Sequence, residues 1–430
     1  MKSKILILSI LLIVLVTILI ISCSSGGKKP NIILIVIDTL RDDHLGYNGY
    51  DRNTSPNIDA FSKEGVVFNN AYSQSGWTWP SVASIFTSLY PKDHGCIFWS
   101  IQMNNELITL AEVLKDKGYN TFGYPSLFLF DIESGFQQGF DVFHQEIFDL
   151  GNPHYINTSQ KVNELIFNDL AEIKEPFFIW AHYYDPHMNY RSHKEFVFGD
   201  GKCTQCRYDG EIAYTDYHIG RLFTKLKKLN RYDDTIIILT ADHGEEFGDH
   251  KRTSHYTLFN EVLKTPLIIK APGLQPIAIN NNVSQIDIAP TILKLIGCDI
   301  PDEFTGADIL NSELVDRPVF AERGDYQIAF QKAVIDGDYK LYDVNIENAD
   351  TSFERYKKEK FYRNERYFFN KKDDPTEKKN LIADPDYQHK INEFEKHFDT
   401  FYGSGERRIE EIKQLDVEIL KNLRALGYME

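Results

Sequence analysis

Short apolar runs recur along the chain, and each one closes on polar or turn-forming residues. They span residues 32–38, 119–124, 177–187, 235–250 and 266–273. Hydrophobicity within the runs is continuous rather than alternating, which is typical of strands buried on both faces of a parallel sheet. The pattern therefore predicts a sheet that is covered on both sides.

Helical segments are expected between these runs. A capping box, Thr109 with Glu112, opens one of them. The predicted helices span residues 56–65, 109–118, 208–229 and 287–297. Repeated strand-then-helix order is the signature of an α/β doubly wound sheet, in which ligands bind beyond the carboxyl ends of the strands.

Polar side chains follow three of the predicted strands. Asp38 closes one, Asp242 and His243 close another, and Asp185 and His187 follow a third. Any one of them could be a helix cap or a member of a buried ion pair. Because strand ends converge at one edge of the sheet, the set as a whole favours a metal site. Mixed oxygen and nitrogen ligands suit Mn or Zn better than Ca or Mg.

The stretch SGWTWPSVAS places Thr78 two residues before Pro80, at the predicted start of a helix. Thr78 fits the N-cap position or the residue before it. A hydroxyl there also lies in the positive end of the helix dipole, where an attacking alkoxide and an anionic ester oxygen are both stabilised. Capping and nucleophilic attack are compatible, so both interpretations of Thr78 stay open.

The pattern changes beyond about residue 315. Shorter alternation indicates a small antiparallel sheet, followed by a charged helical tail over residues 387–430. We expect a catalytic domain over residues 31–314 and a C-terminal subdomain over residues 315–430.

Charge narrows the class of substrate. The 430 residues carry a formal net charge of −16, and the chain offers no basic stripe for a phosphate backbone. This balance argues against nucleic-acid binding. An anionic substrate would need a bound cation to offset the negative field.

The first 23 residues form a targeting segment. A positive start and a 17-residue apolar run end at a small residue before Cys23. The segment resembles a bacterial lipoprotein signal, which implies lipidation of Cys23 and a tether over residues 24–30. A plain membrane anchor is the alternative, but the run is shorter than the ~20 residues that span a bilayer. We therefore expect a lipid-anchored protein of the bacterial cell envelope, outside the cytoplasm.

Two further features have ordinary explanations. Cys203 and Cys206 form an isolated CxxC in a polar loop, which predicts a local disulfide or two free thiols and no catalytic role. Aromatic clusters at residues 77–79, 128–130 and 136–140 are more typical of a core than of a substrate pocket.

Ordered motifs over nearly the whole chain from Pro30 resemble the sulfatase family within the alkaline phosphatase superfamily. They are NIILIVIDTLRDDHLGYNGY, SPNIDAFSKEGVVFNNAY, TWPSVASIFTSLYP, YYDPH, DGEIAYTD, ADHGEEFGDH, NEVLKTPLIIKAPG, DIAPTILKLIG and LRALGY. The resemblance implies an alkaline-phosphatase-like α/β sandwich with a mostly parallel sheet and a C-terminal antiparallel subdomain. It also implies a metal at the strand ends and a covalent intermediate on a residue at a helix N-terminus.

Several positions depart from the sulfatase pattern. Thr78 stands where sulfatases place the cysteine or serine that becomes formylglycine, and threonine cannot form that aldehyde. His187 keeps its implied contact to the ester anion, and His255 replaces a lysine. The other departures are Thr39 for an aspartate, His243 for an asparagine, Val82 for an arginine, and residues 123–126 for a Gly-Lys-Trp-His run.

These departures favour a threonine-nucleophile variant that resembles phosphodiesterase and phosphoglycerol or phosphoethanolamine transferase members of the superfamily. We expect one divalent metal on Asp38, Thr78, Asp242 and His243, and catalytic roles for Thr78, His187 and His255. The expected reaction is hydrolysis of a phosphate diester or phosphonate ester, on a small, glycan-linked or lipid-linked substrate. The alternatives are a sulfatase that works without formylglycine and a noncatalytic envelope lipoprotein that uses the fold as a binding module.

Overall fold

The computed structural model describes residues 28–97, 102–131, 134–147, 157–312, 315–325, 329–345 and 364–403. The described residues from Asn31 to Gly403 belong to one compact unit. The predicted lipidation site Cys23 and residues 404–430 of the predicted tail lie outside the described residues. Among the described helices, none combines the length and apolar composition that crossing a bilayer requires.

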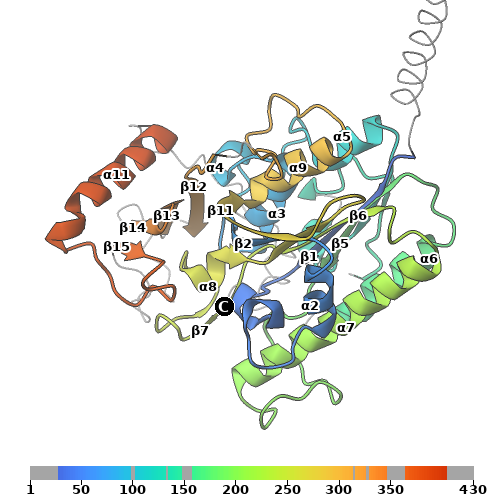
Figure 1. Cartoon of the computed structure of the whole chain (residues 1–430), viewed down its shortest axis with the longest axis horizontal. Helices are drawn as coiled ribbons and strands as arrows, with labels where there is room; N and C mark the ends of the chain where they lie inside the picture. Colours follow the sequence, from blue (N-terminus) through green and yellow to red (C-terminus); the bar gives the residue numbers. More distant parts are fainter. Residues whose placement is uncertain are drawn as a thin grey trace, which may run out of the picture. The chain divides into compact units, whose positions relative to one another are not determined.

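A nine-stranded central sheet organises the described part of the chain (Figure 1). Its strands are β1 (Asn31–Ile37), β2 (Val66–Tyr72), β3 (Asn120–Tyr124), β4 (Val142–Phe143), β5 (Phe177–Tyr183), β6 (Thr235–Ala241), β9 (Lys264–Thr265), β10 (Leu267–Lys270) and β11 (Ile277–Ser284). The order is β11-β2-β10-β6-β1-β5-β3-β4, and β9 pairs with β2. Since β1 is parallel to both of its neighbours, β5 and β6, the predicted parallel centre is confirmed.

Helices cover both faces of this sheet. The described helices of four residues or more in this part of the chain are α2 (Pro56–Ser62), α3 (Thr78–Thr87), α4 (Pro91–His94), α5 (Leu110–Asp116), α6 (Thr158–Asp169), α7 (Thr204–Lys228), α8 (Asn260–Leu263) and α9 (Ile288–Leu295). Short 3-10 turns occur at η1 (Asp42–His44), η2 (Gly46–Asn48), η3 (Phe128–Phe130) and η7 (Gln285–Asp287). The predicted helices are all present, and the capping box of Thr109 with Glu112 is formed.

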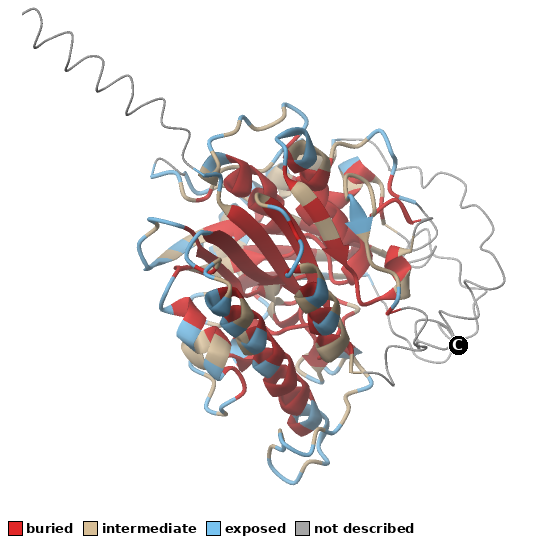
Figure 2. Cartoon of the chain, turned by 90° about the vertical axis from the view of Figure 1, so that its right-hand side faces the viewer, coloured by how far each residue is buried: buried red, intermediate tan, exposed pale blue. Residues whose placement is uncertain are grey.

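The alternating side chains of β1 explain why its sequence is apolar throughout. Ile32, Leu34 and Val36 pack with residues of α3, α5 and α9, whereas the intervening isoleucines pack with α2, α6 and α7. Figure 2 shows the sheet as a buried layer, with helices that turn their exposed faces outward. Continuous hydrophobicity in β1 therefore follows from burial on both faces.

One strand direction differs from the prediction. The apolar run at residues 266–273 contains β10, which is antiparallel to both β6 and β2. Every residue of β10 is nevertheless buried, because the strand lies inside the sheet and not at its edge. A continuous apolar run thus reports burial on both faces and does not fix the direction of the strand.

A second, antiparallel sheet follows in the C-terminal part, as predicted. Its strands are β12 (Val319–Asp325), β13 (Ala329–Asp336), β14 (Tyr339–Asn345) and β15 (Glu365–Asn370), followed by η8 (Pro385–Tyr387) and α11 (Gln388–Tyr402). Apolar residues of α11 cover one face. The other face packs against Tyr72, Leu258, Phe259 and Leu263. The domain boundary near residue 315 stays a prediction.

The structure decides two questions that the sequence left open, the state of two cysteines and the role of an aromatic cluster. Cys203 and Cys206 form a disulfide at the start of α7. Phe130 and Phe136 are buried and pack against each other and against Trp79, so this aromatic cluster belongs to the core.

A buried ion pair joins the second sheet to the segment around α8. Lys340 Nζ lies 2.9 Å from Glu377 Oε1, and both side chains are fully buried. Glu377 Oε2 also accepts a hydrogen bond of 2.9 Å from the Asn260 backbone N–H at the start of α8. Burial lowers the pKa of Lys340 and raises the pKa of Glu377, while each charge opposes the shift of the other.

We expect Lys340→Met to lower the free energy of unfolding by about 3–5 kcal/mol, because the carboxylate of Glu377 is left buried without a counter-charge. Losing the lysine raises the pKa of Glu377 further. A carboxyl whose folded-state pKa is raised favours the folded state at low pH, so the loss should be larger at pH 8 than at pH 5. Urea unfolding at both pH values measures this difference.

The matched control is the double variant Lys340→Met with Glu377→Gln, which keeps an acceptor for the Asn260 N–H but removes the buried charge. It should be more stable than Lys340→Met alone, with little pH dependence. Equal stability of the two variants would contradict a role for the uncompensated charge.

Candidate active site at the strand ends

The two central aspartates lie side by side because their strands are adjacent and parallel. Asp38 directly follows β1 and Asp242 directly follows β6, and the register pairs Ile37 with Ala241. Both aspartates are fully buried. Asp242 Oδ1 accepts hydrogen bonds from the His243 N–H at 2.7 Å and the Thr39 N–H at 3.1 Å. Asp242 Oδ2 and both carboxylate oxygens of Asp38 have no such partner.

Thr39 adopts an unusual backbone conformation directly after Asp38. Its φ is 54°, in the left-handed region that β-branched residues avoid. This conformation accompanies the hydrogen bond from the Thr39 N–H to Asp242. The Thr39 hydroxyl is itself buried without a hydrogen-bond partner. Strain of this kind, held in place by a packed surrounding, is typical of functional sites.

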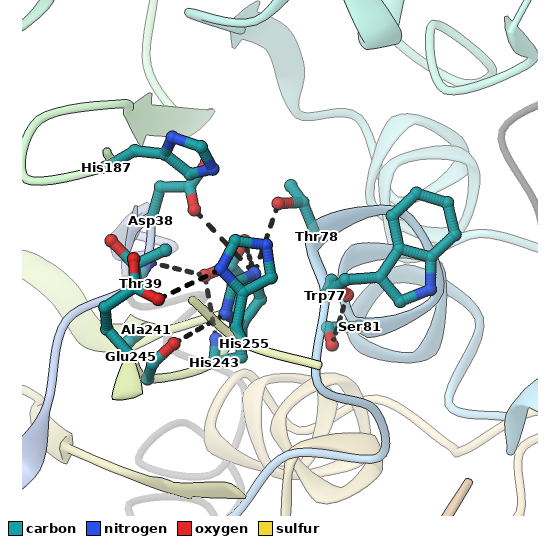
Figure 3. A network of polar contacts seen from close by, with 12 residues as sticks. Asp38, Thr39, Trp77, Thr78, Ser81, His187, Ala241, His243, Glu245 and His255 are labelled. Atoms are coloured by element: carbon teal, nitrogen blue, oxygen red, sulfur yellow. Dashed lines mark hydrogen bonds and ion pairs between the residues drawn. The ribbon is translucent and has the colours of Figure 1, made fainter. Parts of the chain in front are cut away.

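Thr78 is the first residue of α3 and lies opposite Asp38 (Figure 3). The N-cap is Trp77, whose backbone is extended, so the prediction that Thr78 is the N-cap or precedes it is wrong by one position. Thr78 is 2% exposed, and its Oγ1 lies 3.3 Å from His243 Nε2. Its hydroxyl therefore points into the site rather than capping the helix.

His243 presents one ring nitrogen to the carboxylates. Its Nδ1 lies 2.9 Å from the Gly244 carbonyl oxygen, which can only accept, so Nδ1 carries the proton and donates. The other nitrogen, Nε2, lies 3.7 Å from Asp242 Oδ2 and 3.8 Å from Asp38 Oδ1. The predicted group of Asp38, Thr78, Asp242 and His243 is thus assembled in space, although its role stays a prediction.

Burial dominates the electrostatics of this group. Burial raises the pKa of Asp38 well above its usual range, and the charges of Asp242 and Glu245 raise it further. The pKa of Asp242 is also raised by burial, against the opposing effect of His243. Burial lowers the pKa of His243 to about 4. Two carboxylates cannot stay ionised at this depth without a compensating cation.

The two remaining predicted histidines lie next to this group. The His255 ring is 4.5 Å from the His243 ring, and the His187 ring is 5.4 Å from the His255 ring. His255 Nδ1 lies 3.3 Å from Glu245 Oε1. His187 Nδ1 contacts the Tyr184 hydroxyl and the Met188 carbonyl oxygen. His255 thus contacts His243, and His187 contacts His255 in turn.

Asp185 has a different role from the other strand-end residues. Its Oδ2 accepts hydrogen bonds from the Thr158 hydroxyl at 2.8 Å, the Ser159 N–H at 2.8 Å and the Ser159 hydroxyl at 2.6 Å. It therefore fixes the first turn of α6 and does not join the central group.

Sequence reasoning missed His182. This histidine lies within β5, beside Val36 of β1, and is fully buried. Its Nε2 lies 3.9 Å from Asp38 Oδ2. Among the described residues, Asp38, His182 and Asp242 form a buried group whose ligand atoms all lie within 4.8 Å of one another. A histidine inside an otherwise apolar strand, two positions before the level of Asp38, was the available signal.

Arg323 is a second residue that the sequence did not reveal. It lies in β12, and one of its guanidinium nitrogens donates to the Gly76 carbonyl oxygen at 2.8 Å and the His255 carbonyl oxygen at 3.0 Å. The second sheet thereby holds the segment before Thr78 and the segment that carries His255.

Two of the positions that depart from the sulfatase pattern face away from the site. Val82, on α3, is buried in the hydrophobic core of the protein. Tyr124 donates its hydroxyl to Asp169 Oδ2 at 2.7 Å and stacks on His144, on the other face of the sheet. Ser126, by contrast, contacts His182 Nδ1 at 2.9 Å.

The donor set fits a divalent cation. The atoms that face one another are three carboxylate oxygens, two imidazole nitrogens and the Thr78 hydroxyl, and the four distances given above for pairs of these atoms run from 3.3 to 3.9 Å. Two atoms that are each about 2.1 Å from one ion are at most about 4.2 Å apart. Buried carboxylate oxygens without hydrogen bonds are the arrangement that a cation would satisfy.

Comparison with known proteins gives a family match over most of the chain. Residues 30–298 match the family model named Sulfatase, and residues 248–402 match the model named N-sulphoglucosamine sulphohydrolase, C-terminal. The chain is 25% identical over 414 residues to an ulvan-active sulfatase of Formosa agariphila, covering 85% of this chain and 80% of that protein.

Two solved structures share the fold. One, described as a complex with its substrate D-glucosamine-2-N,6-O-disulfate, has a TM-score of 0.73 at 18% identity and covers 89% of this chain and 100% of that one. The other is a phosphonate monoester hydrolase of Agrobacterium radiobacter, with a TM-score of 0.68 at 19% identity and coverage of 86% and 95%. Both structures agree with the fold described above, a central sheet followed by a C-terminal antiparallel subdomain.

Gly244 offers a test of how tightly the strand end is held. A Cβ at this position would lie 2.0 Å from the Glu261 carbonyl oxygen, and backbone atoms cannot rotate away. We expect Gly244→Ala to displace Asp242 and His243 and to lower turnover of nitrophenyl esters about 100-fold per folded molecule, the effect of a misplacement of about 1 Å.

Gly65→Ala is the matched control, since its Cβ would lie 2.6 Å from the Ile269 carbonyl oxygen, away from the site. It should lower stability without a comparable loss of turnover per folded molecule. Equal turnover losses in the two variants would show that the position of Gly244 is not specifically important for the site.

Proposed function

Because the chain belongs to the sulfatase family of ester hydrolases, we propose that it is a metal-dependent hydrolase of anionic esters with Thr78 as nucleophile. Phosphate diesters or phosphonate monoesters are its preferred substrates. The observation that carries the proposal is the Thr78 hydroxyl, buried at the start of α3 and 3.3 Å from His243 Nε2.

Threonine restricts the chemistry. Its secondary alcohol cannot become the aldehyde hydrate on which the formylglycine route depends, so it can act only as a direct nucleophile. The start of α3 favours the negative charge that develops on the attacking oxygen and on the ester. Attack by a hydroxyl and hydrolysis of the resulting ester is a reaction that phosphorus centres support.

The charge of the substrate follows from the side chains around Thr78. Positions that resemble the cationic contacts of sulfatases hold Val82, Tyr124 and His255. Fewer fixed positive charges favour a monoanionic ester over a dianionic one. Phosphate diesters and phosphonate monoesters are monoanions near neutral pH, and the similarity of fold to a phosphonate monoester hydrolase supports this choice.

Asp38, Asp242 and His243 are the residues that would hold the metal, together with Thr78. Mn or Zn fits this mixture of carboxylate and imidazole better than Ca or Mg does. A bound divalent cation supplies charge neutralisation at the ester anion and lowers the pKa of a neighbouring hydroxyl.

The chain's own residues can account for both half-reactions. Thr78 Oγ1 gives its proton to a water molecule and attacks the phosphorus; the bond from phosphorus to Oγ1 forms, and the bond to the leaving oxygen breaks. His187 and His255 contact the anion, and one of them gives a proton to the leaving oxygen. Water then attacks the phospho-threonine, releases the product and restores the hydroxyl.

A sulfatase that works without formylglycine is the second candidate. It is supported by the match to the sulfatase family model and by the similarity to an ulvan-active sulfatase. Sulfate monoesters are also monoanions, so charge alone does not separate the two substrates. A comparison of rates does.

The direct test compares nitrophenyl esters of phosphate, phosphate diester, phosphonate and sulfate with metal-depleted protein refilled with Mn, Zn or Ca. We expect the phosphorus monoanions to be hydrolysed fastest with Mn or Zn. Thr78→Ala should abolish this turnover because no nucleophile is left. Faster turnover of the sulfate ester would select the sulfatase.

Thr78→Ser is the matched control, because it keeps the hydroxyl and removes only a methyl group. It should retain turnover and form a covalent intermediate that mass spectrometry locates on residue 78. Turnover that survives in Thr78→Ala would remove Thr78 from the reaction altogether.

We also propose that the protein is held at the envelope membrane by a lipid on Cys23. The apolar run before Cys23 and the Ser-, Gly- and Lys-rich sequence after it support this location. Glycan-linked or lipid-linked esters are then within reach of the site.

Cys23→Ala should release the protein from the membrane fraction, because the acyl chains that anchor it have no attachment site. Detergent phase partitioning of the wild type and the variant, expressed in a bacterial host, measures the shift. Wild-type protein that partitions into the aqueous phase would contradict the proposal, and Ser22→Ala serves as a control that keeps the cysteine.

A further inference from the structure

His182 occupies a position in β5 at which a buried strand would usually carry an apolar side chain. It follows Ala181 in β5 and pairs in register with Val36, and it is fully buried. Its ring lies against Phe130 and Trp180, with centroid distances of 5.1 and 5.9 Å. Two aromatic side chains therefore pack against the imidazole.

The two nitrogens have different surroundings. Nδ1 lies 2.9 Å from the Ser126 hydroxyl oxygen. Nε2 has no hydrogen-bond partner and lies 3.9 Å from Asp38 Oδ2. A proton on Nε2 would be too far from this carboxylate for a hydrogen bond. The Ser126 hydroxyl can accept a proton from Nδ1, and this tautomer leaves a lone pair on Nε2 that a cation can bind.

In this tautomer a bare nitrogen lone pair faces two buried carboxylates. Lone pair and carboxylate oxygens repel each other unless a cation lies between them. An imidazole whose second nitrogen is fixed by a hydrogen bond is also the usual form of a histidine metal ligand.

We propose that His182 is a ligand of the metal, which makes the centre a two-carboxylate, two-imidazole site with His182 and His243 as the imidazoles. The inference rests on the proposed function, because it assigns a further ligand to the same centre. Ser126 is then a positioning residue that orients the ring.

Two consequences distinguish this centre from an all-oxygen one. Two imidazoles favour Zn or Mn over Ca or Mg, which prefer oxygen ligands. The ligands carry two negative charges, from Asp38 and Asp242, which balance one divalent cation. Thr39 adds no charge where the sulfatase pattern has an aspartate. A neutral centre of this kind is compatible with the depth at which Asp38 and Asp242 are buried.

The test counts imidazole ligands without using activity. Pulsed electron paramagnetic resonance of the Mn-loaded protein detects nitrogen couplings from directly bound imidazoles. We expect two imidazole couplings in the wild type and one in His182→Gln, whose side chain fills much of the same volume. A single coupling in the wild type that persists in His182→Gln would overturn the inference.

Metal affinity supplies a second readout. Competition with a chelator should show that His182→Gln weakens Mn and Zn binding at least about tenfold, since loss of an outer contact alone costs 10–100-fold. Ser126→Ala should weaken binding less and keep both couplings. Unchanged affinity in His182→Gln would contradict a ligand role.

The matched control is His218→Gln, which changes a buried histidine of α7 outside the site. It should keep both couplings and the wild-type affinity. If His182→Gln fails to fold, the coupling count in the wild type and in His243→Gln still decides the question. Wild-type protein that binds no metal would instead contradict the proposed function itself, which separates the two failures.

Discussion

The rest of the site depends on two carboxylates that are buried side by side. Asp38 and Asp242 end adjacent parallel strands, so the sheet itself brings them together. Among the described residues, no lysine or arginine forms a salt bridge with them; backbone N–H groups bond one oxygen, and imidazoles surround the rest. The requirement for a cation therefore follows from the topology, before any chemistry of a substrate is considered.

The sequence predicts those parts of the site that follow a strand. Asp38, Asp242 and His243 come directly after continuous apolar runs, and sheet topology then places them together. His182 was not predicted as a site residue because it lies inside an apolar run, where a single polar residue looks like a tolerated exception. Arg323 was not predicted for another reason. It reaches the site from a different sheet, and no local sequence pattern indicates that contact.

The sequence predicted the fold about as completely as it predicted the site. Apolar runs identified the buried strands because burial on both faces leaves a direct trace in composition. Strand direction leaves no such trace, which explains the error for β10. The start of α5 was accurate, and there the Thr109 side chain closes the cap. The start of α3 was off by one residue, where Trp77 takes the cap position through its backbone alone. The start of α7 was off by four residues, at Thr204 instead of the predicted Tyr208, although the Cys203 side chain caps it.

The hydrogen bonds of Arg323 also bear on how such proteins diverge. Its guanidinium group, carried by β12, bonds the carbonyl oxygens of Gly76 and His255, which flank the site on two other segments. The second sheet is therefore not an independent module that evolution or an engineer can exchange freely. A chimera that imports this sheet from a relative inherits the correct site geometry only if its donor strand carries an equivalent cation at the same register.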